Sequence, residues 1–320
     1  MPGNPNYSTD VLTATVELYL SRKPKDAIFQ KVTVLDVLNK RAKISRRGGI
    51  KLLEPLMYAK STSGGSYSGY DVFDVSPQEG LTNAEFQWKY YYWTVTISGQ
   101  EELENAGEAE MLNLLQAKIN QAELSMQDLL GQHVFLDGTG NGGKNLTGLA
   151  LMVDNAGTYG NIARASNAWW AAQENGSSVA LTPAGSNGMR RMFNDCSYGQ
   201  MTQTPNLIIT TQEGFESYEA LMDSNMRYTN TGEANVGYAK PSLMFRDAQL
   251  FWDDYCQDGH MYFLNTSFIN FVVNPERDFK VTPFKVPANG DSKVMQILFA
   301  GNLTCSNCRH QGKFTALTNA

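Results

Sequence analysis

Residues 86–130 read FQWKYYYWTVTISGQEELENAGEAEMLNLLQAKINQAELSMQDLL, an aromatic run followed directly by a charged and apolar segment. The aromatic part, residues 86–97, is typical of a β-strand, because aromatic and β-branched side chains favour the pleated backbone. Successive side chains of a strand point to opposite faces. Large side chains occur on both faces here, so we expect burial on both. One predicted face holds Phe86, Trp88, Tyr90 and Tyr92, and the other holds Tyr91, Trp93, Val95 and Ile97.

A long helix is predicted directly after this strand. Ser98-Gly99-Gln100-Glu101 matches a capping box, in which the serine and glutamate side chains each satisfy a backbone amide. A helix over 99–130, ending before Gly131, would be about 48 Å long at 1.5 Å per residue. Such a helix would act as a spine for other elements. Its apolar residues recur every three or four positions, which is the helical period: Leu115, Ile119, Ala122, Met126 and Leu129.

The sequence before the aromatic strand predicts a long arm. Residues 50–60 have strand character, and residues 61–69 are polar and rich in glycine and serine. Together with residues 86–97 they suggest two strands joined by a loop. An isolated two-stranded hairpin is only marginally stable in water. We therefore expect another domain or another subunit to cover the aromatic side chains of this arm.

The N-terminal region is predicted to be a basic arm. Residues 1–25 contain three prolines among polar residues and suggest irregular structure, whereas residues 26–43 carry one apolar stripe of helical spacing. Nine bases and two acids lie between Arg22 and Arg47, although the whole chain has a formal net charge of −6. Charge asymmetry of this kind favours contact with an acidic surface, either of this protein or of a partner.

After the long helix the pattern predicts a compact α/β lobe over 146–260. Within it we expect a helix over 182–194, a buried strand over 206–210 and a helix over 211–222. From Met261 onward the sequence is mostly strand-like, and these strands are expected to return and pack on the long helix. The predicted strands are 261–264, 268–273, 279–286 and 293–303, with a hairpin turn at Asn289-Gly290.

The composition excludes several classes of protein. Of the 320 residues, 42% are hydrophobic and 18% charged, which suits a sizeable core and argues against a disordered chain. The net charge of −6 argues against a generally basic nucleic-acid binder. Four cysteines are too few for a disulfide scaffold and fit a reducing compartment. No apolar run is long enough to cross a membrane, and the first residues lack the features of a secretory signal.

Two short motifs leave an enzymatic alternative open. Gly138–Lys144 matches the spacing of a phosphate-binding loop, but Asn145 stands where a Ser or Thr would hold magnesium. The preceding sequence is also helical where that motif requires a strand. Cys305 and Cys308 form a C-x-x-C with His310 nearby, and Cys256 with His260 could complete a zinc site. A zinc site of high sequence specificity has two such close pairs, and this chain has one.

The order of these elements resembles the major capsid proteins of tailed bacteriophages, which have the Hong Kong 97-type capsid fold. Particular stretches carry the resemblance: 64–71 (GGSYSGYD), 97–103 (ISGQEEL), 138–140 with 146–149, 262–265 (YFLN), 274–275 and 300–303 (AGNL). The resemblance implies an α+β fold with an N-terminal arm, an extended loop, a long spine helix in a peripheral domain, and an α/β axial domain. The implied divisions are 1–47 for the arm, 48–97 for the extended loop and peripheral strands, 98–145 for the spine, 146–260 for the axial domain, and 261–320 for the returning peripheral strands.

The resemblance also implies a function. The chain would be a structural protein without catalytic residues, cofactor or metal, assembling into an icosahedral head that encloses double-stranded DNA. Its partners would be further copies of itself in pentamers and hexamers, with scaffolding, portal and decoration proteins and non-specifically bound DNA, and no membrane. It would be found in the virion shell and, before assembly, in the host cytoplasm. The residues expected to contact neighbouring subunits are Lys60, Tyr67, Tyr70, Trp88, Tyr90 and Tyr92.

Two further points remain open in the sequence. Some capsid proteins of this type become covalently linked through Lys and Asn side chains, and here Lys60 lies in the right loop and Asn274 or Asn302 in the right domain. Another phage structural part, such as a tail tube or a head decoration protein, is an alternative. A tail tube protein would be mostly β and would lack a helix of the predicted length.

Overall fold

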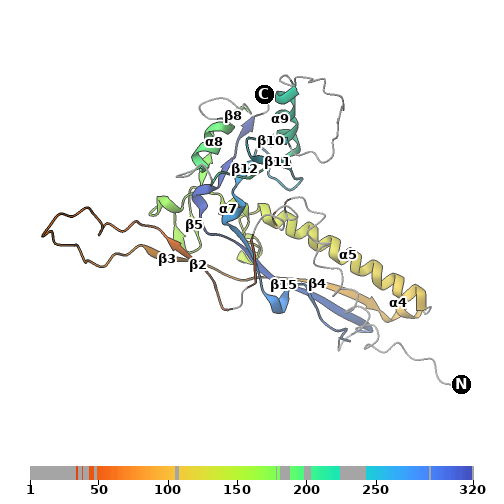
Figure 1. Cartoon of the computed structure of the whole chain (residues 1–320). Coiled ribbons are helices and arrows are strands. Elements are labelled where there is room, and N and C mark those ends of the chain that lie inside the picture. Colours follow the sequence, from red (N-terminus) through yellow and green to blue (C-terminus); the bar gives the residue numbers. More distant parts are fainter. Residues whose placement is uncertain are drawn as a thin grey trace, which may run out of the picture.

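The computed structural model describes residues 34, 38, 43–46, 49–104, 108–177, 179–180, 188–197, 203–223, 243–287 and 290–318. Within these residues the chain forms two lobes and a hairpin that projects from them (Figure 1). The predicted helix over 26–43 falls outside this part except for Val34 and Leu38, both helical, and Lys43, which begins a strand. Asn289 of the predicted hairpin turn and the start of the helix predicted over 182–194 also fall outside it.

A five-stranded sheet forms the lobe that carries the long helix. Its order is β1-β13-β15-β14, and β4 pairs with another part of β15. The longest contact joins β4 to β15 in antiparallel register from Lys89↔Gly301 to Ser98↔Ser292. The bounds of the five strands are β1 Lys43–Arg46, β4 Lys89–Ser98, β13 Ile269–Val273, β14 Lys280–Val281 and β15 Ser292–Cys305.

This pairing corrects the prediction that the aromatic strand is one arm of the hairpin. The segment predicted as the first arm, observed as β2 (Leu52–Met57), pairs with β3 (Leu81–Phe86), whose sequence LTNAEF gave no strand signal. The aromatic strand begins after β3 and leaves the hairpin to join β15. Strand character is local in sequence, but the choice of strand partner depends on contacts between distant segments.

The predicted capping box and most of the predicted helix are observed. Ser98 Oγ accepts from the Glu101 amide at 3.2 Å, and Glu101 Oε2 accepts from the Ser98 amide at 3.1 Å. Helix α4 spans Gly99–Glu104 and helix α5 spans Glu108–Phe135. The predicted stop at Gly131 is wrong. Val134 and Phe135 are fully buried, and this packing outweighs the low helix propensity of one glycine.

The second lobe is built on a six-stranded sheet of order β10-β11-β9-β12-β16-β7. Ile208 and Phe263 face a core formed with helices α8 (Met189–Cys196) and α9 (Gln212–Asp223), whereas Leu207 and Tyr262 face the main core. The sheet is therefore buried on both faces. Its strands are β7 Gln173–Asn175, β9 Leu207–Thr210, β10 Leu243–Phe245, β11 Ala248–Trp252, β12 Met261–Leu264 and β16 Gly312–Phe314.

The predicted division between the α/β lobe and the returning strands, placed between residues 260 and 261, does not match the division of the strands between the two sheets. β12 pairs with β9 and β16, so the first of the strands expected to return to the long helix belongs to the α/β lobe. The later strands β13, β14 and β15 do lie in the sheet of the other lobe. Smaller elements complete the fold: α6 Gly140–Gly143, α7 Leu149–Met152, β5 Thr158–Tyr159, β6 Ile162–Ala163, β8 Val179–Ala180, β17 Leu317–Thr318 and the 3₁₀ turns η1 Ala168–Trp170, η2 Thr266–Phe268, η3 Pro275–Arg277 and η4 Cys308–His310.

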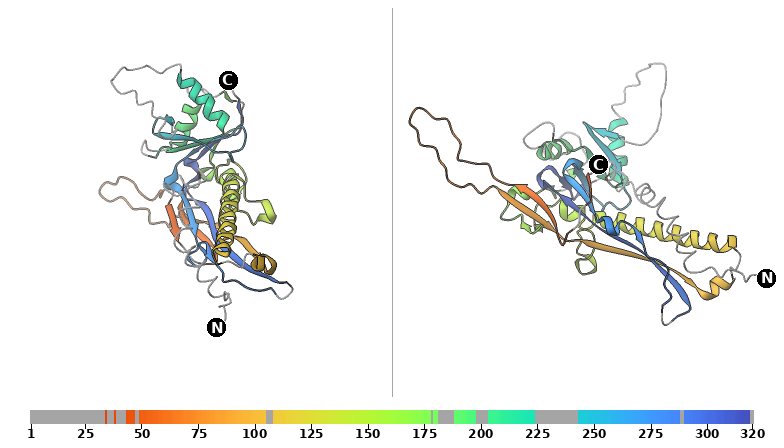
Figure 2. Two further views of the ribbon diagram at one scale, coloured as in Figure 1. Left: turned by 90° about the vertical axis from the view of Figure 1, so that its right-hand side faces the viewer. Right: turned by 60° about the horizontal axis from the view of Figure 1, so that its bottom comes forward.

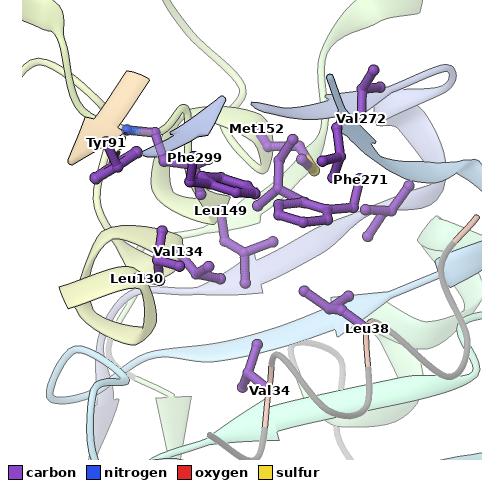
Figure 3. Close-up of a cluster of buried hydrophobic side chains, with 14 of the residues drawn as sticks. Val34, Leu38, Tyr91, Leu130, Val134, Leu149, Met152, Phe271, Val272 and Phe299 are labelled. Carbon is purple, nitrogen blue, oxygen red and sulfur yellow. Dashed lines mark hydrogen bonds between the residues drawn. The ribbon is translucent and has the colours of Figure 1, made fainter. Parts of the chain in front are cut away.

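The main core lies where the long helix, the five-stranded sheet and α7 meet (Figure 3). Phe271 and Phe299 stack with ring centroids 6.0 Å apart, and Leu149 lies beside them. Val34 and Leu38 are buried in the same cluster. The Val34 amide donates to Asp253 at 3.1 Å, so a buried hydrogen bond joins residue 34 to the end of β11. Burial raises the pKa of Asp253 to about 6.

A glycine allows the chain after α6 to approach the end of α5. A Cβ at Gly148 would lie 2.3–2.6 Å from the carbonyl oxygens of Leu136, Val134 and His133. These atoms belong to the backbone and cannot swing away. Gly148 therefore sets the distance between the end of the long helix and α7.

We predict that Gly148→Ala lowers the free energy of unfolding by about 1–3 kcal/mol, as overpacking of a close contact does. Gly64→Ala is the control, because a Cβ there meets nothing within 4 Å, and it should change stability by less than about 0.5 kcal/mol. Urea unfolding followed by circular dichroism measures both. Equal stability of the two variants would show that the close approach at Gly148 imposes no constraint.

Candidate assembly site

The large exposed hydrophobic side chains concentrate on one projecting segment. Of the seventeen such residues in the described part of the chain, ten lie between Ile50 and Leu81. Monomeric soluble proteins rarely expose apolar patches of this extent unless they bind something there. The ten are Ile50, Leu53, Met57, Tyr58, Tyr67, Tyr70, Val72, Phe73, Val75 and Leu81.

The base of the hairpin has one buried face and one apolar exposed face. Residues of β2 alternate between buried and exposed, and Leu52 and Leu56 point into the core. Met57 and Leu81 are register partners at the end of the pairing, and both are exposed. The amide of Tyr58 donates to the Gly80 carbonyl at 3.0 Å and extends the ladder by one step. Apolar surface is therefore presented to solvent by paired, ordered strands.

Contacts with the body hold this base in one direction. The rings of Tyr58 and Trp169 stack at 5.6 Å, and Phe86 meets Tyr159 edge-on at 4.9 Å. The Glu85 amide donates to the carbonyl of Gly160 at 2.9 Å. A Cβ at Gly160 would lie 2.9 Å from both the Ala84 and Phe86 side chains. Segment 158–170 thus acts as a clamp on the hairpin base.

Beyond the clamp, residues 59–80 extend away from both lobes (Figure 2). Past the Tyr58–Gly80 bond, the hydrogen bonds described for this segment join its own residues: Thr62 Oγ1 donates to Gln78 at 2.9 Å, and the Ser68 amide donates to Asp71 at 2.8 Å. Tyr67 and Phe73 contact each other edge-to-face at 5.0 Å. Tyr70 is fully exposed. Among the described residues, nothing from the body covers this tip.

A second exposed surface lies along β4. Tyr90 and Tyr92 are 61% and 70% exposed, whereas their neighbour Tyr91 is 8% exposed. The Tyr91 hydroxyl accepts from the Leu146 amide at 2.6 Å and lies 2.9 Å from His133 Nδ1. Burial raises the pKa of Tyr91 to about 12 and lowers that of His133. Tyr91 therefore joins β4, α5 and the following loop inside the chain, while its two neighbours face outward.

The structure divides the residues predicted to contact neighbouring subunits into exposed residues and one buried residue. Lys60, Tyr67, Tyr70, Tyr90 and Tyr92 are all exposed. Trp88 is a correction: it is 8% exposed, and its indole N–H donates to the Gly49 carbonyl at 2.7 Å, so it packs within its own chain. It was expected to share a face with Tyr90, but the chain leaves β3 at Phe86 and enters β4 at Lys89, which breaks the alternation.

Sequence reasoning missed part of the exposed apolar surface. The hydrophobic residues of the tip form only a short run within a polar and glycine-rich stretch, which is too short to establish a period. The expectation of a loop between two strands was the one available signal, because an apolar residue in a projecting loop has no core to enter. The missed residues are Ile50, Leu53, Met57, Tyr58 and Leu81 of the base and Val72, Phe73 and Val75 of the tip.

The Gly138–Lys144 loop does not have the geometry of a phosphate-binding loop. It follows helix α5 and contains α6, whose residues Asn141 and Gly142 have positive φ values of 53° and 66°. Such a loop should connect a strand to a helix. The Lys89 ammonium donates to the carbonyl of Gly143. The loop is therefore a connector fixed to the start of β4.

The cysteine and histidine residues of the zinc hypothesis do not come together as a metal site among the described residues. Cys305 and Cys308 are fully buried, and burial raises the pKa of Cys305. His310 Nδ1 lies 2.8 Å from the Cys196 carbonyl, and its ring stacks on Phe268 at 4.8 Å. Within the described ranges no group of three or more His, Cys, Asp or Glu side chains is arranged to hold a metal ion.

Asn302, one of the two candidates for a covalent link, is a structural residue. It is fully buried, its Oδ1 accepts from the amides of Thr147 and Leu303, and its Nδ2 donates to the Gln87 carbonyl at 2.9 Å. These bonds hold β15, the approach to β4 and the approach to α7 together. Asn274 is partly exposed, and its side chain accepts from the Glu276 amide at 2.9 Å.

Comparison with known proteins finds a shared fold at low sequence identity. No family model matches the sequence, and no curated protein matches it. Among solved structures, the cyanophage A-1(L) capsid matches with a TM-score of 0.65 and 13% identity over 92% of this chain and 95% of that one. The capsid of a native GTA particle matches with a TM-score of 0.62 and 11% identity, over 88% of this chain and 90% of that one. The chain has the capsid fold.

The capsid fold also occurs in a holo-SrpI encapsulin complex from Synechococcus elongatus. This structure matches with a TM-score of 0.53 and 9% identity, covering 88% of this chain and 87% of that one. The capsid fold agrees with the mixed α and β architecture predicted from the sequence. Among the described helices, none is long and apolar enough to cross a membrane.

We predict that Tyr91→Phe lowers the free energy of unfolding by about 1–3 kcal/mol, because a buried amide and an imidazole nitrogen lose their partner. Tyr92→Phe on the same strand is the matched control and should stay within about 0.5 kcal/mol of the wild type, since Tyr92 is 70% exposed. Thermal unfolding of the two purified variants tests this. A smaller loss for Tyr91→Phe than for Tyr92→Phe would contradict the assignment.

Proposed function

We propose that this protein is the major capsid protein of a tailed bacteriophage. Copies of the chain form pentamers and hexamers of an icosahedral head that encloses double-stranded DNA. The observation that carries the proposal is the projecting hairpin, which exposes ten hydrophobic residues within the part of the chain that the structure describes. A neighbouring subunit covers them. The capsid fold, and its higher similarity to the cyanophage capsid than to the encapsulin complex, supports this assignment.

In this proposal each part of the chain has a place in the shell. Residues 1–47 are the N-terminal arm, 48–97 the extended loop with its peripheral strands, and 98–145 the spine helix with the loop that follows it. Residues 146–260, with β12 and β16, form the axial domain around the symmetry axes. The rest of 261–320 completes the peripheral domain. No step of this function requires a catalytic residue, a cofactor or a metal ion.

The charge distribution supports protein contacts over tight DNA binding. The chain has a net charge of −6, and the basic stretch between Arg22 and Arg47 is an exception to it. We infer that this stretch contacts the acidic residues around α4 of its own or a neighbouring copy. The remaining acidic surface repels the phosphate backbone, which would let packaged DNA move along the shell. Scaffolding, portal and decoration proteins are the other proposed partners, in the host cytoplasm during assembly and in the virion.

Expression of the full chain, alone and together with a candidate scaffolding protein, tests the proposal. Closed particles in negative-stain micrographs are the expected result. Their content distinguishes two particle types of this fold: nuclease-protected double-stranded DNA in particles from infected cells supports a phage head. A protein that stays monomeric under all conditions, or closed particles from infection that hold no DNA, would refute the proposal.

We predict opposite effects for two aromatic substitutions. Tyr70→Ser should leave the free energy of unfolding within about 0.5 kcal/mol of the wild type and should strongly reduce particle yield, because Tyr70 is fully exposed on the tip. Trp88→Ala should lower subunit stability by about 3–5 kcal/mol, because Trp88 is buried.

Urea unfolding and particle counts measure the two effects separately. Met244→Ser, an exposed hydrophobic position outside the hairpin, is the control for Tyr70→Ser. Normal assembly of the Tyr70 variant, or equal defects at Met244 and Tyr70, would count against a role of the hairpin tip in assembly.

A further inference from the structure

A lysine is buried in the sheet of the α/β lobe. Lys313 lies at the centre of β16, and its side chain is 8% exposed. Its register partners are Tyr262 on β12 and Glu174 on β7. Register partners project from the same face of a sheet, and Tyr262 belongs to the main core. These three side chains therefore form a row on the face that is turned toward the main core. Lysine is almost never buried there without a partner.

Two carboxylates supply that partner. Lys313 Nζ lies 3.4 Å from Asp154 Oδ2 and 3.5 Å from Glu174 Oε1. The other oxygen of each carboxylate has its own donor. Asp154 Oδ1 accepts from the Ala156 amide at 2.8 Å, and Glu174 Oε2 accepts from the amide of Asn155 at 3.4 Å. These bonds orient both carboxylates, so that each turns one oxygen toward the lysine nitrogen.

A buried hydroxyl lies beside this group. Tyr262 is fully buried, and within the described residues its hydroxyl has no hydrogen-bond partner. Burial raises the pKa of Tyr262, and the nearby Cys256, Glu174 and Asp154 add to this effect. The hydroxyl therefore keeps its proton. A buried donor without an acceptor costs free energy, so the site has an unused donor for an oxygen placed next to Lys313.

The charges of the group do not balance. One ammonium faces two carboxylates, and both carboxylates are partly buried. Charges withdrawn from water lose hydration, and their mutual attraction repays this loss only in part. Condensation of the ammonium with one carboxylate would replace two charges by a neutral amide. The surroundings of Lys313 thus favour a product with a single remaining carboxylate.

The geometry suits an attack of the lysine nitrogen on the side-chain carboxyl group of Asp154. Groups held about 3–3.5 Å apart in one molecule react as if present at about 10⁵ M or more. Asp154 follows α7, whose residues Leu149 and Met152 are fully buried. Its own carbonyl accepts from the Ala172 amide at 3.0 Å, just before β7. The backbone of Asp154 is therefore held in place together with its side chain.

We propose that Lys313 and Asp154 of one chain condense to an isopeptide bond. A proton passes from the ammonium to the Asp154 carboxylate, and the resulting amine attacks its Cγ atom. Glu174 takes a proton from the attacking nitrogen and gives it to the departing hydroxyl. The C–N bond forms, one C–O bond breaks and water leaves. Glu174 ends in the state in which it began, and the step consumes no oxidant, cofactor or metal ion.

This bond is internal to the subunit. It uses none of Lys60, Asn274 and Asn302, which the resemblance associates with a link between subunits. It joins residues 159 positions apart and fastens the segment after α7 to the sheet of the α/β lobe. A crosslink across so long a loop stabilises a fold mainly by restricting the unfolded chain, as a disulfide does. The inference does not depend on the proposed function, because the bond forms within a folded subunit.

Intact mass spectrometry of the full wild-type chain under denaturing conditions tests the bond. The expected mass is that of the sequence less one water molecule. Trypsin digestion locates the loss: it should yield one branched peptide that contains both Lys313 and Asp154, because trypsin does not cleave after an acylated lysine. A chain of full sequence mass would overturn the proposal, and so would a loss of water that maps elsewhere.

A second ion pair in the same digest is the control for proximity alone. Lys51 Nζ lies 2.7 Å from Glu85 Oε2, closer than Lys313 lies to either carboxylate, but these side chains are 56% and 37% exposed. Water keeps both charged, so their peptides should be unlinked. Linkage of Lys51 to Glu85 to the same extent would show that the buried surroundings of Lys313 have no special effect.

Two variants test the roles of the carboxylates. Asp154→Ala should keep its full mass, because the lysine has lost the group that it attacks. Glu174→Gln should slow the loss of water by about 100-fold or more, as removal of a proton-transfer group does. Glu276→Gln, at an exposed glutamate, is the matched control and should link as fast as the wild type.

The outcomes separate this inference from the proposed function. A linked chain that forms no particles would support the bond and refute the capsid role, and particles built from chains of full mass would do the reverse. A Glu174→Gln chain that links as fast as the wild type would overturn the proton transfer assigned to Glu174. If Asp154→Ala does not fold, the branched peptide of the wild type still decides the proposal.

Discussion

The antiparallel pairing of β4 with β15 is the contact on which the rest of the structure depends. It joins the segment that leaves the hairpin to the last long strand of the chain. β15 uses its other side for β13 and β14, so β4 is held at the edge of the sheet. One set of β4 side chains, which includes Tyr91 and Val95, is then buried, and the other set, with Tyr90 and Tyr92, is left in solvent. A single register thus decides which aromatic residues are buried inside the subunit and which face solvent.

The hairpin consists of a base that is fixed to the body and a tip that the described part of the body leaves uncovered. In a protein that assembles, this arrangement would favour binding of the tip to a neighbour. Tyr58 on Trp169, and Phe86 on Tyr159, fix the direction of the base. A fixed direction lowers the entropy lost when the tip binds a neighbour. In the proposed shell each tip contact can be weak, because a closed shell repeats the contact many times and several neighbours hold each subunit. The exposed apolar residues of the tip would favour aggregation in a protein without such partners.

Local features of this fold could be predicted from the sequence, and long-range ones could not. The Ser98–Glu101 cap, the strand around Ile208 and most of the long helix follow from short motifs and periodicity. The partner of the aromatic strand depends on β15, which lies near the end of the chain, and no local pattern encodes that choice. Trp88 was placed on the exposed face because alternation was extended through the turn between β3 and β4.

In the candidate site, too, the features encoded by short sequence patterns could be predicted, and those that depend on long-range strand pairing could not. The sequence predicts an arm in need of cover, and the exposed Tyr67 and Tyr70 lie on it. The edge of β4 could not be foreseen, because it becomes an edge only through the pairing of β15 with β13 and β14. The apolar residues Val72 and Val75 were missed because a short hydrophobic run within a polar loop is too short to establish a period.

The two edges of the chain explain how an assembling protein can avoid the wrong contacts. An open strand edge pairs with any extended chain, so most proteins cover or block it. Here Pro55 removes a donor from the hairpin base, while a groove wall from α5 restricts access to β4. A contact between two different surfaces of the subunit is heterologous, and such a contact forms a ring where the rotation closes and an open chain where it does not.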